Sequence, residues 1–430
     1  DLLEAHHAEL IVLISDEAGR TVPDSIDEIR EAVDFCRYYA LKAREHFSAP
    51  IALPGPTGES NKLSLHGRGV FVCISPWNFP LAIFVGQIAA ALAAGNSVIA
   101  KPAEQTPLIA AKAIALFHQA GIPTAALHLI TGKGPTVGPL LIAQPQLSGV
   151  AFTGSTATAK RINRQLGERD GAILPLIAET GGQNAMIVDS SALPEQVVDD
   201  VISSAFLSAG QRCSALRVLY IQEEIADGLI DMIKGAMDSL TLGKPSELAT
   251  DIGPVIDKTA LNRLEQHIQD IERGKLNNDN KQASIIARYD ESKLPKTGHF
   301  FAPTMVKLDS MTQLKEEVFG PVLHIIRYPS KALDTVLQEI NDSGYGLTLG
   351  IHTRIENSAE YICEHTNVGN TYVNRNMVGA VVGTQPFGGE GLSGTGPKAG
   401  GPHYLFRFAT EKTATINTVA TGGNTDLFEL

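Results

Sequence analysis

Short apolar runs alternate with turns and helix-like stretches, and this alternation restricts the possible folds more than any other feature of the chain. In the first half, the apolar runs lie at residues 70–75, 97–100, 127–131 and 150–153. Stretches with the composition of helices separate them, at residues 80–94, 107–120 and 135–143. A strand, a helix and a further strand in succession are typical of a parallel sheet that helices cover on both faces. We therefore predict an α/β unit able to hold a nucleotide at the carboxyl ends of its strands.

The second half repeats this organisation. Its apolar segments lie at residues 185–188, 217–221, 322–326 and 347–351. The chain has 430 residues, which is enough for two or three domains of about 150 residues each. We expect a second α/β unit, with the polar stretch 273–298 on its surface.

The first forty residues predict a helix. Ser25 and Glu28 have the spacing of a capping box, in which each side chain binds the backbone N–H of the other residue. Apolar residues then recur every three or four positions, as one buried stripe requires: Ile26, Ile29, Val33, Cys36 and Ala40. We expect the helix to begin near Ser25 and to bury this stripe.

Two further segments predict a small β element outside the main body. Residues 50–69 are rich in Gly, Pro, Ser and Asn, which indicates turns or a projecting β-hairpin. Residues 410–430 alternate Thr, Ile, Asn and Val, which indicates an exposed strand or a strand paired with a partner.

Composition and charge argue against several classes of protein. The net charge is −12 and no long basic run is present, so we expect no contact with nucleic acid phosphates. The most apolar window, residues 79–95, is shorter than a bilayer-spanning helix and contains Gln87, which favours a buried helix over membrane contact. The 4 cysteines are widely spaced and form no CxxC pair. We therefore expect no metal site or disulfide framework, and a reducing, cytoplasmic location.

Three side chains are candidates for catalysis. Cys213 follows a polar loop with a glycine and an arginine, a setting that favours the thiolate needed to attack a carbonyl carbon. Glu179 ends an apolar run before two glycines, where partial burial would raise its pKa toward that of a useful base. Asn78 lies in a loop with two prolines, which would hold its amide rigidly beside an oxyanion. Each also has a structural interpretation: a buried thiol, an exposed strand-end acid and an asparagine that satisfies a turn.

Two strand ends are candidates for cofactor binding. Lys101 and Glu104 directly follow a strand, where they could clamp ribose hydroxyl groups, and Glu104 would repel the 2′-phosphate of NADP and so favour NAD. Gly154 and Ser155 follow another strand and open a helix, whose first N–H groups could bind a pyrophosphate.

Seven segments make these individual signals specific because of their order. They are PWNFP (76–80), AKPAEQTP (100–107), FTGST (152–156), ETGG (179–182), GQRC (210–213), EEVFGP (316–321) and PFGG (386–389). In order and approximate spacing they resemble the aldehyde dehydrogenase superfamily. Residues 32–40, 391–405 and 416–430 resemble more closely the aldehyde dehydrogenase module of bifunctional proline utilization A. That module oxidises L-glutamate γ-semialdehyde, the hydrolysed form of Δ1-pyrroline-5-carboxylate, to glutamate with NAD.

The resemblance implies a role for each candidate. Cys213 would be the nucleophile, Asn78 and the Cys213 backbone amide would hold the oxyanion, and Glu179 would activate water to hydrolyse a thioester. NAD would be bound by six residues: Lys101, Glu104, Gly154, Ser155, Glu317 and Phe319. The substrate would contact aromatic walls and carboxylate anchors: Phe79 and Phe408, and Ser214, Gly400 and Gly401. For Phe408, a core aromatic is the alternative.

The resemblance also implies an α/β aldehyde dehydrogenase-like fold with two parallel-sheet domains and a small β oligomerisation flap. The NAD-binding domain would comprise residues 1–49 and 68–182 without its N-terminal portion, the catalytic domain residues 183–409, and the flap residues 50–67 and 410–430. A homodimer is expected. The chain would be a piece of a longer fusion, in which an FAD-dependent proline dehydrogenase domain precedes it.

Two other functions stay open at this point. Another acidic semialdehyde, such as succinate semialdehyde, could be the substrate. The chain could also be a catalytically inactive module with a binding or structural role, although a purely structural role would not need Cys213, Glu179 and Asn78 together.

Overall fold

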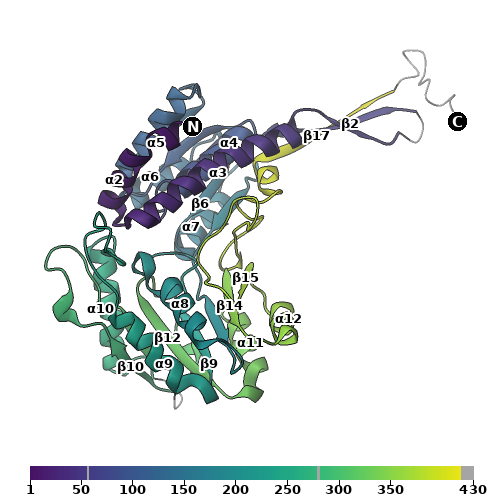
Figure 1. Cartoon of the computed structure of the whole chain (residues 1–430). Helices are drawn as coiled ribbons and strands as arrows, with labels where there is room; N and C mark the ends of the chain where they lie inside the picture. The colour runs from purple at the N-terminus through teal and green to yellow at the C-terminus, as the bar shows by residue number, and fades with distance from the viewer. Residues whose placement is uncertain (56–57, 278–280, 418–430) are drawn as a thin grey trace.

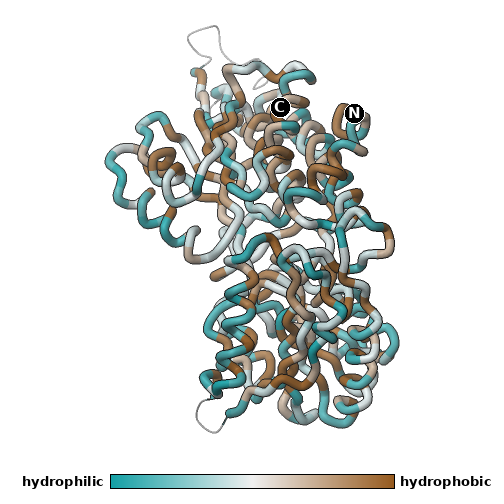
Figure 2. Tube along the Cα trace, turned by 90° about the vertical axis from the view of Figure 1, so that its left-hand side faces the viewer, coloured by the Kyte–Doolittle hydropathy of each residue, from teal (hydrophilic) through white to brown (hydrophobic). Residues whose placement is uncertain are grey.

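The chain folds into two lobes and a projecting sheet (Figure 1). The computed structural model describes residues 1–55, 58–277 and 281–417. In Figure 2 the hydrophobic stretches gather inside each lobe, and hydrophilic segments lie mainly on outer helices and loops. None of the described helices is long and apolar enough to span a membrane.

A five-stranded parallel sheet forms the centre of the first lobe, in the order β5-β4-β3-β6-β7. Its strands are β3 (Val70–Ile74), β4 (Ser97–Lys101), β5 (Leu127–Leu129), β6 (Leu147–Thr153) and β7 (Leu176–Glu179). The helices of this lobe are α1 (Leu2–Ala5), α2 (His7–Ala18), α3 (Val22–Phe47), α4 (Ala82–Ala93), α5 (Pro107–Gln119), α6 (Gly134–Ile142) and α7 (Thr156–Gly167). Apolar residues of α2 to α5 pack on one face of the sheet, and those of α6 and α7 pack on the other. The predicted parallel sheet with helices on both faces is therefore confirmed, and the apolar window 79–95 forms the buried helix α4.

A seven-stranded sheet forms the second lobe, in the order β10-β11-β12-β9-β8-β14-β15. Its strands are β8 (Ala185–Val188), β9 (Val218–Gln222), β10 (Ala283–Arg288), β11 (Thr304–Leu308), β12 (Val322–Tyr328), β14 (Thr348–His352) and β15 (Asn370–Val373). All neighbours are parallel except β10, which runs antiparallel to β11. The helices are α8 (Pro194–Ala205), α9 (Glu223–Asp238), α10 (Lys258–Glu272), α11 (Leu333–Asp342) and α12 (Glu356–Glu364).

Short elements complete the architecture. They are the pair β13 (Tyr345–Gly346) and β16 (Glu390–Gly391), and the 3₁₀ turns η1 (Leu207–Gly210), η2 (Glu291–Lys293), η3 (Met311–Gln313), η4 (Ser330–Ala332) and η5 (Tyr404–Phe408). The stretch 273–298, expected to be surface, also contains β10, so part of it pairs with the sheet as an edge strand.

Three strands make the projecting sheet. They are β1 (Ile51–Leu53), β2 (Ser60–Gly67) and β17 (Ala409–Ile416), with β2 in the middle and antiparallel to both neighbours. The eight residues of β17 pair with β2 from Ala409 opposite Gly67 to Ile416 opposite Ser60. The hairpin-like segment and the C-terminal strand thus lie in one sheet, as Figure 1 shows. The remainder of the predicted strand segment, residues 418–430, lies outside the described residues.

Helix α3 differs from its prediction at the start and in its buried face. It begins at Val22, with Thr21 as its N-cap and Pro23 in its first turn, so Ser25 and Glu28 lie inside the helix and the predicted capping box is wrong. The buried stripe includes Ser25, Glu28, Ile29, Ala32 and Val33, whereas Ile26 and Ala40 are exposed. Polar residues occupy the buried face because partners from other segments surround them.

The predicted boundary at residues 182 and 183 falls between β7 and β8, the last strand of the first sheet and the first strand of the second. The functional names given to the two domains stay predictions. Turn η5, which the prediction assigned to the catalytic domain, packs instead into the core of the first lobe through Tyr404, Leu405 and Phe408.

Candidate active site

Cys213 ends a tightly constrained loop between α8 and β9. Ser208, Ala209 and Gly210 have φ angles of 55°, 54° and 63°, so three consecutive residues are left-handed. A Cβ on Gly210 would lie 2.2 Å from the carbonyl oxygen of Gly320, so this position requires glycine for space as well as for conformation. The loop then delivers Cys213, partly buried, just before the strand.

A buried arginine braces this loop from behind. Arg217 donates from Nη1 to the carbonyl oxygen of Gly210 at 2.7 Å and from Nη2 to that of Arg212 at 3.0 Å. Its Nη2 also contacts Glu317 Oε1 at 2.9 Å. Asn184 donates to the carbonyl oxygen of Cys213 at 2.6 Å. The backbone around the thiol is therefore held by two side chains, Asn184 and Arg217, which directly precede β8 and β9.

Asn78 lies against the same loop. Its Nδ2 donates to the carbonyl oxygen of Gln211 at 3.0 Å, and its side chain is buried. The Asn78 backbone belongs to the loop that follows β3, so the contact joins the two lobes. The structure thus places this amide against the loop that leads to Cys213, at a residue two positions before it.

Glu179, at the end of β7, has a carboxyl group packed among glycines. Oε2 accepts from the N–H of Gly389 at 3.0 Å, and Oε1 is buried with no hydrogen-bond partner in the described part of the chain. A Cβ on Gly388 or Gly394 would approach the carboxylate to 2.9 Å. Burial raises the pKa of Glu179 to about 8, although the Gly389 N–H and the positive charge of Lys398 oppose this shift.

The thiol of Cys213 has a perturbed pKa as well. Burial raises it to about 12, and the negative charges of Glu317 and Glu179 add to the shift. Contacts place these groups in one neighbourhood. Arg217 joins Glu317 to the loop that holds Cys213, and a Cβ on Gly181, two residues after Glu179, would lie 1.7 Å from Glu317 Oε2. Burial therefore opposes ionisation of Cys213, contrary to the prediction that its loop favours the thiolate.

The predicted cofactor residues lie at the carboxyl edge of the first sheet. Lys101, at the end of β4, is buried and lies 3.7 Å from Glu104 Oε2. That oxygen also accepts from the N–H of Gly134 at 3.2 Å. Ser155 is the N-cap of α7, directly after Gly154 and β6. The structure brings these residues to the same sheet edge as Asn78 and Glu179.

Glu317 and Phe319 come from the second lobe. The Glu317 carboxylate pairs with Arg217, yet burial keeps its pKa above the usual value. The Phe319 ring meets Trp77 edge-on, with ring centroids 5.6 Å apart. Trp77 directly precedes Asn78, so this contact closes the space between the lobes beside the candidate site.

The predicted substrate residues divide into two groups. Phe79 follows Asn78, and Ser214 follows Cys213, so both lie next to candidate catalytic residues. The N–H of Gly400 donates to the Tyr39 hydroxyl at 2.8 Å, and that of Gly401 donates to the carbonyl oxygen of Lys398 at 3.1 Å. Both N–H groups therefore already have acceptors within the protein, and their role as carboxylate anchors stays a prediction.

Phe408 is a core aromatic in this structure. Its side chain has 0% exposure, and its ring lies 5.0 Å from that of Phe71 on β3. This is the alternative that the sequence left open for it, and the structure gives no substrate-facing surface to the ring.

A family model described as "Aldehyde dehydrogenase family" matches residues 1–414. The chain belongs to the aldehyde dehydrogenase family. It is 52% identical over 414 residues to the bifunctional protein PutA of Klebsiella aerogenes, a match that covers 96% of this chain and 30% of that protein. The chain thus spans less than a third of the length of this relative.

Two solved structures agree with this membership. A crystal structure of bifunctional proline utilization A (PutA) matches with a TM-score of 0.94 and 58% identity, over 98% of this chain and 42% of that one. The 1-pyrroline-5-carboxylate dehydrogenase from Thermus with bound NAD matches with a TM-score of 0.90 and 33% identity, over 96% of this chain and 79% of that one. The predicted aldehyde dehydrogenase-like fold is confirmed.

Several residues around this aldehyde dehydrogenase site were not found from the sequence. Arg217, Asn184 and Lys398 hold backbone or charge in place at the site. Of these, only Arg217 had a visible signal, because a charged residue that opens an apolar strand run needs a buried partner. Asn184 and Lys398 look like ordinary polar residues of loops.

Proposed function

We propose that the chain oxidises L-glutamate γ-semialdehyde, formed from Δ1-pyrroline-5-carboxylate, to L-glutamate with NAD, the second step of proline catabolism. One observation carries the proposal: the Asn78 amide of the first lobe donates to the Gln211 carbonyl oxygen at 3.0 Å, which puts a candidate oxyanion donor beside the Cys213 loop. A thiol, a base of near-neutral pKa and an amide beside the thiol loop are the groups needed to form and hydrolyse a thioester. The Thermus relative bears the name of this activity.

In the first half of the reaction Cys213 is the nucleophile. Its sulfur bonds to the aldehyde carbon, the carbonyl electron pair moves to oxygen, and the thiol proton passes to solvent water. Glu179, whose pKa is raised to about 8, stays available as the base for the later hydrolysis step. Asn78 Nδ2 would turn from the Gln211 carbonyl oxygen to the new oxyanion, together with the Cys213 backbone N–H.

The thiohemiacetal then loses hydride to become a thioester. When bound, NAD supplies the hydride acceptor for this oxidation. Glu179 next takes a proton from water as the water oxygen attacks the thioester carbon. The C–S bond breaks, its electron pair returns to the Cys213 sulfur, and the acid product leaves.

The residues predicted to hold NAD fit that group. The Glu104 side chain is 43% exposed beside buried Lys101, so its carboxylate is available to ribose hydroxyl groups. Ser155 is exposed at the N-terminus of the 12-residue helix α7, a place suited to a pyrophosphate. Thr106 Oγ1, shortly after Glu104, is buried without a partner in the described residues. Glu317 and Phe319 would hold the nicotinamide ribose from the other lobe.

Turnover with two aldehydes tests the substrate. We expect NADH to form with glutamate γ-semialdehyde at a kcat/KM at least about 100-fold above that with succinate semialdehyde, because a site built for an α-amino carboxylate leaves polar groups unpaired without it. Equal values would favour a general acidic semialdehyde dehydrogenase.

Replacement of the nucleophile tests the mechanism. Cys213→Ala should lose NADH formation while the chain stays folded, since the thiol is only partly buried and makes no structural bond. Wild-type turnover in this variant would contradict the mechanism. No turnover in the parent chain, with NAD still binding, would favour an inactive binding module.

We also propose a homodimer formed through the sheet β1-β2-β17. Ile51, Leu53 and Ile416 on this sheet are 58%, 38% and 53% exposed, more apolar surface than a solvent-facing sheet needs. In the full-length protein an FAD-dependent proline dehydrogenase domain would share the chain, as the bifunctional relatives suggest, and the four free cysteines agree with a cytoplasmic location.

A further inference from the structure

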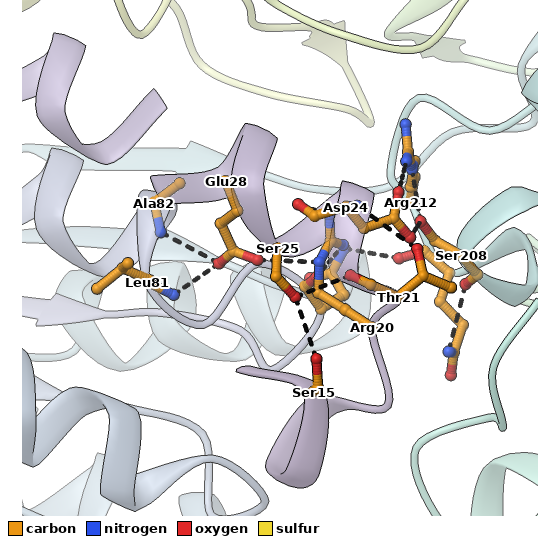
Figure 3. Close-up of polar contacts among 12 residues, drawn as sticks. Ser15, Arg20, Thr21, Asp24, Ser25, Glu28, Leu81, Ala82, Ser208 and Arg212 are labelled. Atoms are coloured by element: carbon orange, nitrogen blue, oxygen red, sulfur yellow. Dashed lines mark hydrogen bonds and ion pairs between the residues drawn. The ribbon is translucent and has the colours of Figure 1, made fainter. Parts of the chain in front are cut away.

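The start of helix α3 has a buried stripe of polar and charged side chains, where a helix packed on a core would have apolar ones. Arg20, Asp24 and Glu28 recur every four residues, so they share one face of the helix and its approach. Their exposures are 5%, 8% and 1%, which is unusual for charged side chains unless they are paired. Figure 3 shows these side chains reaching in two directions from one helix.

One direction leads to the loop that holds Asn78. Glu28 Oε1 accepts from the N–H groups of Leu81 and Ala82 at 2.7 and 3.2 Å, at the start of α4. Glu28 Oε2 pairs with Arg20 Nε at 2.9 Å, and Arg20 Nη1 donates to the carbonyl oxygen of Asn78 at 2.8 Å.

The same arginine also fixes the neighbouring aromatic side chain. The guanidinium carbon of Arg20 lies 4.1 Å from the centre of the Phe79 ring, which is a cation–π contact. The polar stripe of α3 therefore holds both the backbone of Asn78 and the ring of Phe79.

The other direction leads to the loop that holds Cys213. Ser208 donates from Oγ to Asp24 Oδ2 at 2.7 Å, and Arg212 donates from Nη2 to Asp24 Oδ1 at 2.5 Å. Arg212 also donates from Nε to Ser208 Oγ at 2.9 Å. Asp24, Ser208 and Arg212 thus form a closed triangle, shown at the right of Figure 3.

This triangle lies where the backbone needs support. Ser208 and Ala209 have φ angles of 55° and 54°, a left-handed conformation that non-glycine residues adopt only when surrounding contacts impose it. The Ser208 side chain is bound on both sides by the triangle, so its backbone cannot relax without breaking charged hydrogen bonds. Cys213 directly follows Arg212, so the position of Arg212 in the triangle restricts the position of Cys213.

We propose that Asp24 is a positioning residue that fixes Cys213 relative to Asn78, by clamping Ser208 and Arg212 to the helix whose Arg20 and Glu28 hold the Asn78 loop. The proposal rests on the proposed role of Cys213 as nucleophile. Asp24 lies 184 residues before Ser208 in the chain and touches no group expected to react. It acts only through the two loops that it joins.

Asp24→Asn and Ser208→Ala test this clamp with two readouts. We expect kcat with glutamate γ-semialdehyde and NAD to fall about 10- to 100-fold, with KM little changed, because a misplaced nucleophile lowers the rate of the chemical step more than binding. The second readout is the rate of Cys213 alkylation by iodoacetamide, with exposed Cys363 as the internal reference in the same mass spectrum. We expect Cys213 alkylation to become faster, since a released loop exposes the thiol.

The combination of slower turnover and faster Cys213 alkylation distinguishes positioning from a purely structural role. A purely structural role would lower the melting temperature and leave both rates of the folded protein unchanged. The matched control is Arg37→Gln, a substitution further along α3. It breaks an exposed ion pair between Arg37 and Glu4 of α1 and should change neither rate.

The double variant Asp24→Asn with Ser208→Ala tests whether the two residues act together. If Asp24 and Ser208 act through the same set of hydrogen bonds, kcat of the double variant should fall no further than kcat of the more impaired single variant. Both rates at wild-type level in folded Asp24→Asn would overturn the proposal. Should that variant fail to fold, the same two rates in Ser208→Ala decide. Because alkylation needs no substrate, it still decides even if the parent chain does not turn over glutamate γ-semialdehyde, a result that counts against the proposed function alone.

Discussion

The Glu179 carboxyl group is buried, accepts from the N–H of Gly389, and has a second oxygen without a hydrogen-bond partner among the described residues; its pKa is raised. Burial disfavours the charged form of the carboxyl group and raises its pKa to about 8. The positive charge of Lys398 acts in the opposite sense but does not cancel this effect. A base of this kind is inactive at low pH and becomes active as the pH rises through its raised pKa.

We therefore expect the thioester-hydrolysis rate to rise with pH along a limb with an apparent pKa of about 8. Stopped-flow kinetics with glutamate γ-semialdehyde would follow NADH formation and subsequent turnover separately. In Glu179→Gln that limb should disappear, and acyl-enzyme should accumulate after a burst of NADH. An unchanged limb in this variant would assign the titration to another group.

Gly210 is a position in the Cys213 loop where only glycine fits. A Cβ there would lie 2.2 Å from the carbonyl oxygen of Gly320, and φ is +63°. Gly210→Ala should therefore destabilise the chain by roughly 2 to 4 kcal/mol through strain and overpacking. Chemical denaturation would measure the loss. Gly228→Ala, in α9 with nothing within 4 Å of the added Cβ, is the control and should not be destabilised.

At the scale of elements, the projecting sheet is held by strand pairing rather than by a core. All residues of β17 after Ala409 are exposed, although eight positions pair with β2. A three-stranded sheet with so little burial gains stability when another surface covers its apolar side chains.

The double variant Ile51→Ser with Leu53→Ser should convert the proposed dimer into a monomer. Both side chains are exposed in the single chain, so the fold of each protomer should survive. Light scattering after size-exclusion chromatography would report the mass, and circular dichroism the fold. Leu248→Ser, which removes an 82% exposed leucine from the second lobe, is the matched control. A double variant that stays dimeric would place the interface elsewhere.

Helix α3 shows how one element can join parts of the molecule that form separate cores. Its apolar residues pack into the first lobe, while Asp24 reaches the Cys213 loop of the second. A buried ion pair adds little net stability. It can still fix the position of the Cys213 loop relative to α3, because one geometry satisfies all its hydrogen bonds.

At the scale of the whole molecule, side-chain contacts join the two lobes beside the candidate site. The contact between Trp77 and Phe319 is one, and the hydrogen bond from Gln105 to Asp257 Oδ2 at 3.2 Å is another. The chain has 1 tryptophan, so the fluorescence of Trp77 reports directly on this region.

NAD should quench the fluorescence of Trp77, because the predicted nicotinamide-side residue Phe319 touches its ring. A fluorescence titration of the chain with NAD and NADP would measure this, and NAD should bind at least about tenfold more tightly if Glu104 repels the 2′-phosphate. Glu104→Gln should reduce the difference in affinity between NAD and NADP. Equal quenching by both dinucleotides in the parent chain would count against the role given to Glu104.

Local pattern was enough to predict the alternating strands and helices and the projecting hairpin, and it singled out Cys213, Glu179 and Asn78 as candidates, whose roles stay predictions. Apolar runs and glycine-rich turns encode which backbone is buried, and this information is local. The ordered motifs added the family, because seven segments in one order are specific even though each is weak alone.

Tertiary contacts alone decided which polar groups are satisfied, and by whom. Ser25 and Glu28 have the spacing of exposed capping residues, yet Arg20 and the backbone N–H groups at the start of α4 bind Glu28, and their side of α3 is a buried face. The Gly400 amide is bound to Tyr39 and the Phe408 ring is enclosed by the first lobe, which no local pattern indicates. A hydrogen bond depends on atoms within about 3 Å. Its partners here are separated by up to hundreds of residues, so they become neighbours only when the whole chain has folded.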